Sequence, residues 1–278
     1  MTELPVEIVQ SILEQCATVY PKEARQSLLL VSHTVLDLVA PIVFATFTLD
    51  ARAFEHVTAL ANEYKGNLIF SRYVHALHAP MIHSGSDGNF LSNLGTAGIQ
   101  AFGRVRVFTG SLTMLHAMIF HTYPFQPTHI YMEDVCDGMI IGELASRLRG
   151  VTHLRTSGPA GFSISRMVEL EGLQNLVYSL TETYSFKENP GGFIKGVKHV
   201  LQEARQLQQF TLLSDDNVWI KGPTWQSQRL STADWRELKA VILALTVEDP
   251  RLRLVETDGR SRQNPRLPHE WDALWTFD

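Results

Sequence analysis

Histidine is the residue type in this chain that first suggests chemistry. The sequence holds eleven histidines, and the densest group is His75, His78 and His83. Imidazole nitrogens hold zinc when several of them converge on one ion. A spacing of three along a strand turns His75 and His78 to opposite faces, and the spacing of five between His116 and His121 misaligns those two on a helix. We therefore expect histidines on the surface or packed between repeats, and no metal site.

Phosphate-binding and nucleophilic motifs are also missing from the sequence. Gly191 and Gly196 have the spacing of a phosphate loop, but Val197-Lys198 follows them in place of Lys-Ser/Thr. The two cysteines, Cys16 and Cys136, lie far apart and in no recognised motif, and Gly-x-Ser-x-Gly does not occur. The sequence predicts no catalytic residue, no cofactor and no disulfide framework.

Acidic and aromatic side chains offer the remaining candidates for a site. The pairs Glu133-Asp134 and Asp215-Asp216 follow predicted strands, where a carboxylate caps the next helix or faces a ligand. Capping is the simpler interpretation. Five aromatic residues also follow strands, and they either anchor a partner or pack inside a repeat: Tyr123, Phe125, Tyr184, Trp219 and Trp225.

The composition is that of a globular protein with a sizeable core. Its 278 residues are 45% hydrophobic and 19% charged, and 24 Lys+Arg against 29 Asp+Glu give a net charge of −5. This acidic balance argues against a nucleic-acid partner, because phosphate neutralisation needs excess Lys and Arg. The most apolar stretch, 38–49, is too short to cross a membrane. With only two cysteines and no signal peptide visible, we expect a cytoplasmic or nuclear protein.

Three short helices are predicted in the first fifty residues. Apolar side chains recur every fourth residue from Leu4 to Ile12 on the first helix. Pro21 opens the second helix, and Ser32 caps a third helix that Pro41 ends. Helices this short cannot bury a large core by themselves. An apolar surface should be left over, and such surfaces usually dock to another molecule.

These residues resemble an F-box. The matching parts are the opening Leu4-Pro5, the apolar spacing of the first helix and the later Val31-Ser32. The tryptophan or arginine that often follows Val-Ser is absent, and 34–36 read Thr-Val-Leu. The stretch 40–49 is similar to F-box-like proteins abundant in fungi, in which a short strand leads from the F-box into the next domain.

The resemblance implies that residues 1–50 form an F-box-like helical module. Such a module binds the Skp-type adaptor of a cullin–RING ubiquitin ligase. Part of its apolar set has to be internal core, because three helices also pack on each other. The residues to which the resemblance assigns adaptor binding are Leu4, Pro5, Ile8, Ile12, Leu28, Val31 and Leu38.

A degenerate repeat fills the rest of the chain. The pattern apolar-x-x-apolar-x-apolar recurs with its middle residue at Leu77, Val105, Ile130, Leu154, Leu176, Phe210 and Leu252. The intervals are 28, 25, 24, 22, 34 and 42, and the first four match the period of leucine-rich repeats. Helical patterns lie between these strands at 112–120, 139–148, 194–204 and 235–245.

This alternation predicts an α/β fold. Residues 51–278 are expected to form an irregular leucine-rich-repeat-like solenoid of parallel strands and helices. An ordinary doubly wound α/β domain would alternate in the same way, but the short strand spacing favours the solenoid. F-box-like fungal proteins commonly carry such a region, and the ends of many are similar to Asp249-Pro250-Arg251-Leu252 with a later tryptophan-containing tail at 270–275.

The sequence therefore predicts a binding protein and not an enzyme. On the F-box resemblance, the repeat region presents an unknown target protein to the ligase, whose other subunits transfer ubiquitin, and neither nucleic acid nor membrane is a partner. One alternative is a repeat-type interaction module whose N-terminal helices only cap the solenoid. The two interpretations differ in the position of residues 1–45, which form a separate lobe in an F-box protein and pack flush on the first repeat if they only cap it. The other alternative is an enzyme of an unrecognised α/β class, which would need a deep polar pocket.

Overall fold

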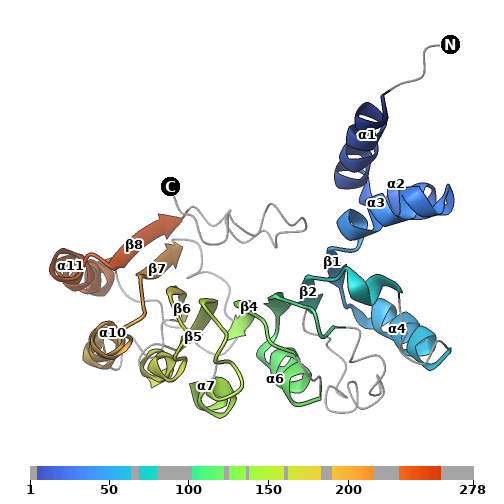
Figure 1. The fold of residues 1–278 in the computed structure, drawn as a ribbon. Coiled ribbons are helices and arrows are strands. Elements are labelled where there is room, and N and C mark those ends of the chain that lie inside the picture. Colours follow the sequence, from blue (N-terminus) through green and yellow to red (C-terminus); the bar gives the residue numbers. More distant parts are fainter. Residues whose placement is uncertain are drawn as a thin grey trace.

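The chain folds into a short helical segment followed by a long parallel sheet. The computed structural model describes residues 5–63, 69–79, 102–121, 125–135, 138–159, 162–182, 190–215 and 232–257. Within these ranges the sheet has eight strands in the order β1 to β8, which is the order of the chain, and it does not close on itself (Figure 1). The predicted α/β class with parallel strands is confirmed.

The helical segment comprises α1 (Val6–Val19), α2 (Pro21–Gln26), η1 (Leu28–Leu30) and α3 (His33–Val43). Ser32 caps α3 as predicted, because its Oγ accepts the N–H of Val35 at 3.2 Å. Pro41 does not end α3, contrary to the prediction, and the helix runs on to Val43. Proline removes one N–H from a helix, and in the last turn the next bonds still form: Phe44 N–H reaches the Ala40 carbonyl at 3.0 Å.

Each strand pairs in parallel with the strand before it and the strand after it. The strands are β1 (Thr46–Thr48), β2 (Ala76–Ala79), β3 (Val107–Gly110), β4 (His129–Val135), β5 (His153–Pro159), β6 (Asn175–Glu182), β7 (Gln209–Asp215) and β8 (Leu252–Thr257). A short strand does follow the helical segment, as the resemblance implied.

The register corrects one position of the predicted repeat. Leu77 pairs with Phe108, which in turn pairs with Ile130, so Phe108 and not Val105 is the middle residue of β3. The intervals from 77 through 108, 130, 154, 176 and 210 to 252 are therefore 31, 22, 24, 22, 34 and 42. The predicted middle residue was wrong because Phe102, Val105 and Phe108 are all apolar and three residues apart. The first two positions of the repeat pattern therefore fit at two starting points.

Helices connect the strands and lie along one face of the sheet (Figure 1). Their bounds are α4 (Ala51–Glu63), η2 (Ile69–Arg72), α6 (Leu112–His121), α7 (Gly138–Ala145), α8 (Phe162–Ser165), η3 (Arg166–Glu169), α10 (Pro190–Glu203) and α11 (Thr232–Glu248). Helix α4 was not predicted. Asp50 was the available signal, since its Oδ1 accepts the N–H of Ala53 at 2.8 Å and so caps the helix.

A backbone motif marks the start of each repeat. The carbonyl of the residue just before one strand accepts two successive N–H groups from the start of the next strand. Thr152 and His153, for example, both donate to the Thr128 carbonyl, at 2.9 and 3.1 Å. The carbonyls of Ala45, His75, Arg106, Thr152 and Gln174 are used in the same way. The repeats are thus stacked by main-chain bonds that do not depend on side-chain identity.

Two hydrophobic clusters form the interior. The main cluster contains the stacked middle residues of the strands and the inward faces of the connecting helices, including Leu77, Phe108, Leu154 and Phe210. A second cluster lies within the helical segment and has four buried members, Ala17, Ala24, Val39 and Val43. Phe44 packs against both clusters and marks the junction between them.

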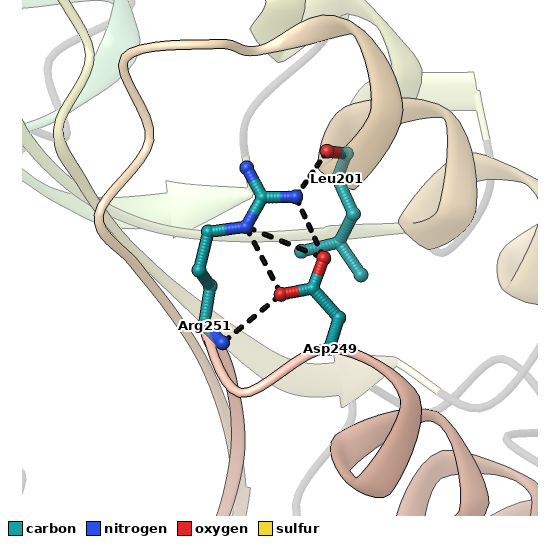
Figure 2. Close-up of polar contacts among 3 residues, drawn as sticks. All are labelled: Leu201, Asp249 and Arg251. Carbon is teal, nitrogen blue, oxygen red and sulfur yellow. Dashed lines mark hydrogen bonds and ion pairs between the residues drawn. The ribbon is translucent and has the colours of Figure 1, made fainter.

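An arginine just before the last strand pairs with a nearby aspartate and bonds to the layer of helices. The Arg251 guanidinium contacts the Asp249 carboxylate, with Nη2 to Oδ2 at 2.6 Å and Nε to Oδ1 at 3.0 Å, and it also donates to the Leu201 carbonyl in α10 (Figure 2). The carbonyls in the last turn of a helix lack partners within the helix, so Arg251 satisfies one of them. The hydrogen bond from Arg251 lowers the pKa of Asp249.

Candidate protein-binding surfaces

Helix α1 has one apolar face inside the helical segment and another in solvent. Leu13 and Ala17 point into the cluster of the helical segment. Ile8, Ile12 and Val19 lie within about 40° of one another around the helix and are 48%, 48% and 55% exposed. We call these three residues the α1 apolar stripe. Exposure of this stripe to water is unfavourable, because apolar surface gains free energy when it is buried.

Six of the seven residues assigned to adaptor binding are described, and they divide into two groups. Pro5, Ile8, Ile12 and Val31 are exposed, whereas Leu28 and Leu38 are half-buried. Leu28 packs against the cluster of the helical segment and belongs to its internal packing. Leu4 lies outside the described residues.

Further exposed apolar residues of the helical segment were not singled out from the sequence, among them Val19 and Leu30. Val19 lies three turns after Ile8 on the same face of α1, so helical periodicity was a signal that could have found it. Leu30, in η1, is 82% exposed. Its position in a run of three leucines gives no indication of which one faces solvent.

An arginine joins two helices of the helical segment close to the start of the sheet. Arg25 of α2 donates through Nε to the Val43 carbonyl at 3.0 Å, and its Nη2 donates to the same oxygen. The guanidinium also lies 5.4 Å from the centre of the Phe44 ring, in a cation–π arrangement. These contacts hold α2 against the end of α3, directly before β1.

The second candidate surface is the face of the sheet opposite the connecting helices. Along each strand, the residues on either side of the buried middle residue point to this face. The register aligns them in two rows across the strands. The first row is Ala76, Val107, His129, His153, Asn175 and Gln209, and the second is His78, Thr109, Tyr131, Arg155, Val177, Thr211 and Arg253.

Histidines from two neighbouring strands stack at the centre of the first row. The His129 and His153 rings have centroids 4.0 Å apart and planes 11° apart. The next side chain in the row, Asn175, places its Nδ2 2.9 Å from Nε2 of His153. We call His129, His153 and Asn175 the histidine ladder. All three are half-buried.

In the second row, a cation lies over an aromatic ring. Arg155 is only 4% exposed, and its Cζ is 4.8 Å from the centre of the Tyr131 ring. Thr109 and Thr211, in the same row, are also buried. This face of the sheet therefore combines polar and aromatic side chains, but its second row is largely buried within the chain itself.

The structure corrects the placement of the acidic pairs. Glu133 and Asp134 lie within β4 and not after it, because β4 continues to Val135. Asp215 is the last residue of β7, and Asp216 lies outside the described residues.

Other sequence candidates take structural positions where they are described. Gly191 and Gly196 belong to α10 and form no phosphate loop. Phe125 is buried edge-on against Phe108, with ring centroids 6.0 Å apart, so it packs within the fold. His116 stacks on Phe120 at 4.5 Å. The candidates that lie outside the described residues are His83, Tyr123, Cys136, Tyr184, Trp219 and Trp225.

Two other kinds of site are absent from the described part of the chain. Its histidine, cysteine, aspartate and glutamate side chains form no group of three that could hold a metal ion. Its helices include none with the length and apolarity needed to span a bilayer.

Comparison with known proteins adds no relative. No protein family matches the chain, and no curated protein matches its sequence.

Proposed function

We propose that this chain is the substrate-recognition subunit of a Skp–cullin–F-box ubiquitin ligase. The helical segment binds the Skp-type adaptor, and the region from 51 onward, a leucine-rich-repeat-like solenoid, binds a target protein. Transfer of ubiquitin belongs to other subunits, so the chain acts by binding alone.

The α1 apolar stripe is the observation that carries this proposal. The helical segment has its own buried cluster, so the stripe is not needed for its internal packing. Ile8 and Ile12 are nevertheless half exposed, at the two positions where the F-box resemblance expects contact with the adaptor. Burying apolar side chains of this size against a partner is a common source of binding energy.

The order of the strands supports the solenoid part of the proposal. Every strand bonds to its neighbours in sequence, and the connecting helices lie on one face (Figure 1). A doubly wound domain places helices on both faces and reverses its strand order. Five of the six intervals between middle residues are between 22 and 34, and the three between Phe108 and Leu176 fall within the 20–29-residue period of leucine-rich repeats.

The capping alternative fits less well. A terminal cap places its apolar surface on the core of the first repeat. Here the buried members of the helical segment form a cluster separate from the main one, joined through Phe44. Figure 1 shows α1 extending away from the sheet beyond β1.

Binding of purified full-length chain to a purified Skp-type adaptor, followed by calorimetry, tests the proposal. We expect the wild type to bind and the double variant Ile8→Asp, Ile12→Asp to bind at least about 100-fold more weakly, because each aspartate replaces apolar contact with a carboxylate that must be desolvated.

The matched control is Ser11→Asp with Thr18→Asp. It adds the same two charges to exposed positions of α1, about a quarter-turn away from the stripe. This control should bind like the wild type, and circular dichroism should show all three proteins equally helical. Failure of the wild type to bind, or equal binding by the stripe variant, would contradict the proposal.

A further inference from the structure

The histidine ladder is built from a dipeptide that recurs in two successive repeats. Thr128-His129 begins β4 and Thr152-His153 begins β5, 24 residues later. The parallel register places the two histidines side by side, and their rings stack at 4.0 Å. In the next repeat, Asn175 of β6 occupies the equivalent position.

Hydrogen bonds define the protonation state that this stack requires. The amide nitrogen of Asn175 can only donate, so Nε2 of His153, 2.9 Å away, has to accept. Nδ1 of His153 then carries the proton and donates to Oγ1 of Thr152 at 2.9 Å, while that hydroxyl donates to the Thr128 carbonyl at 3.2 Å. His153 is therefore neutral in this arrangement.

The same arrangement recurs one repeat earlier. Nδ1 of His129 lies 2.9 Å from Oγ1 of Thr128, and this hydroxyl donates to the Arg106 carbonyl at 3.3 Å. His129 therefore donates through Nδ1 as well. Both imidazoles are thus held in the same tautomer by the threonine before them.

A second proton on His153 would break this network. It would place an N–H at Nε2 against the Asn175 amide nitrogen, two donors facing each other at 2.9 Å. It would also place a positive charge on a half-buried ring stacked against His129. Stacked imidazoles this close take up protons as a coupled pair.

We propose that the histidine ladder is a proton-sensitive joint, which keeps β4, β5 and β6 packed while His153 is neutral and loosens them when His153 gains a proton. Among the described residues, the titratable or charged groups on this face near the ring are His129 and Tyr131 of β4 and Arg155 of β5 itself. Asn175 and Gln209, farther along the row, are uncharged.

The direction of the pH effect follows from the burial of the ring. Burial, together with a smaller contribution from His129, lowers the pKa of His153 to about 4. The folded state then binds fewer protons than the unfolded state, whose histidine titrates near 6.5. The contribution of the ladder to stability is complete above pH 6.5 and is lost as the pH falls toward 4.

An NMR titration of the histidine rings in the full chain tests the joint. The reference is His153 itself in the urea-unfolded chain. We expect His153 in the folded chain to titrate at least about one pH unit below this reference, and the variant His129→Asn to raise the folded midpoint. A folded midpoint equal to the unfolded one, or one unchanged by His129→Asn, would overturn the proposal.

Hydrogen exchange measures the loosening itself. Between pH 7 and pH 4.5, after correction for intrinsic exchange, the protection of β5 amides should fall about tenfold more than that of β7 amides. In His153→Asn, which continues the amide row of Asn175, this difference should disappear, and in His199→Asn it should remain. Equal losses for β5 and β7 in the wild type would overturn the proposal without reference to any variant.

Discussion

At the start of the last strand, one arginine satisfies two partners at once. Arg251 pairs with the Asp249 carboxylate and donates to the Leu201 carbonyl, so a single side chain joins β8 to α10. The Asp-Pro-Arg-Leu sequence that resembles the ends of F-box-like proteins thus has a local structural role. It shapes the turn that leads into the last strand.

Replacing this carboxylate should weaken the fold in a pH-dependent way. We expect Asp249→Asn to lower the free energy of unfolding by about 1 kcal/mol at pH 7. The pKa of Asp249 is lowered in the folded state, so its contribution exists above the ordinary value of 3.8 and disappears as the pH falls through the lower folded value. Urea midpoints of wild type and variant should therefore differ at pH 7 and converge at low pH.

The control for this change is a second ion pair, which joins Lys239 of α11 to Glu256 of β8. Lys239 and Glu256 lie 2.6 Å apart but are more exposed, so solvent screens them. Glu256→Gln should shift the urea midpoint less than Asp249→Asn does. An equal shift would show that the Arg251 contacts add nothing beyond a surface charge pair.

At the scale of elements, the ends of β2 and β3 approach each other closely. A Cβ built on Gly110 would lie 2.1 Å from the Ala79 carbonyl oxygen, which is a backbone atom and cannot rotate away. The neighbouring Ser111 N–H donates to this same oxygen at 3.3 Å. The sheet therefore requires a residue without a side chain at this point.

Gly110→Ala should consequently destabilise the protein by about 2–4 kcal/mol, because either the strand pair separates or the backbone is strained. The matched variant is Gly150→Ala, where an added Cβ meets no atom within 4 Å. Thermal unfolding should show a clear decrease for the first variant and almost none for the second. Similar melting temperatures for the two would contradict the close approach.

Apolar periodicity predicted most of the elements, for a physical reason. A middle residue such as Leu154 or Leu176 is buried between strand and helices, so only an apolar side chain is tolerated there. The same rule failed where apolar residues were too many, at Phe102, Val105 and Phe108. It also failed where they were too few, in α4, whose exposed surface is mostly polar.

The candidate surfaces were only partly predictable. Ile8 and Ile12 followed from helical spacing, but α1 is apolar on more than one side. Only packing decides that Leu13 faces inward and Val19 outward. His129 and His153 were not singled out, because they become neighbours only through the register of β4 and β5. The recurring Thr-His dipeptide was the one available signal.

At the scale of the whole molecule, two cores of very different size should differ in stability. The cluster of the helical segment has four buried members, whereas the main cluster extends through the sheet. Small cores contribute little free energy. The helical segment should therefore open more readily than the strands at the centre of the sheet.

Hydrogen exchange with mass spectrometry checks this expectation. The free energy of opening should be lower for amides of α1 to α3 than for amides of β5 to β7. Val39→Ala should lower it further by about 2 kcal/mol, and only in the helical segment. Leu154→Ala, the matched change in the main core, should affect the strands. If Val39→Ala loosened both regions equally, the two cores would be one cooperative unit.

The strict adjacency of the strands has a consequence for how such a chain can vary. From β2 to β7, each strand bonds only to the one before it and the one after it in the chain. The intervals between middle residues range from 22 to 42 residues, so the connections differ greatly in length. The next strand nevertheless pairs in register after short and long connections alike. Insertions in the connections between strands should therefore leave the sheet intact. Variants of this molecule can differ in the length of these connections while the main-chain hydrogen bonds between strands are kept.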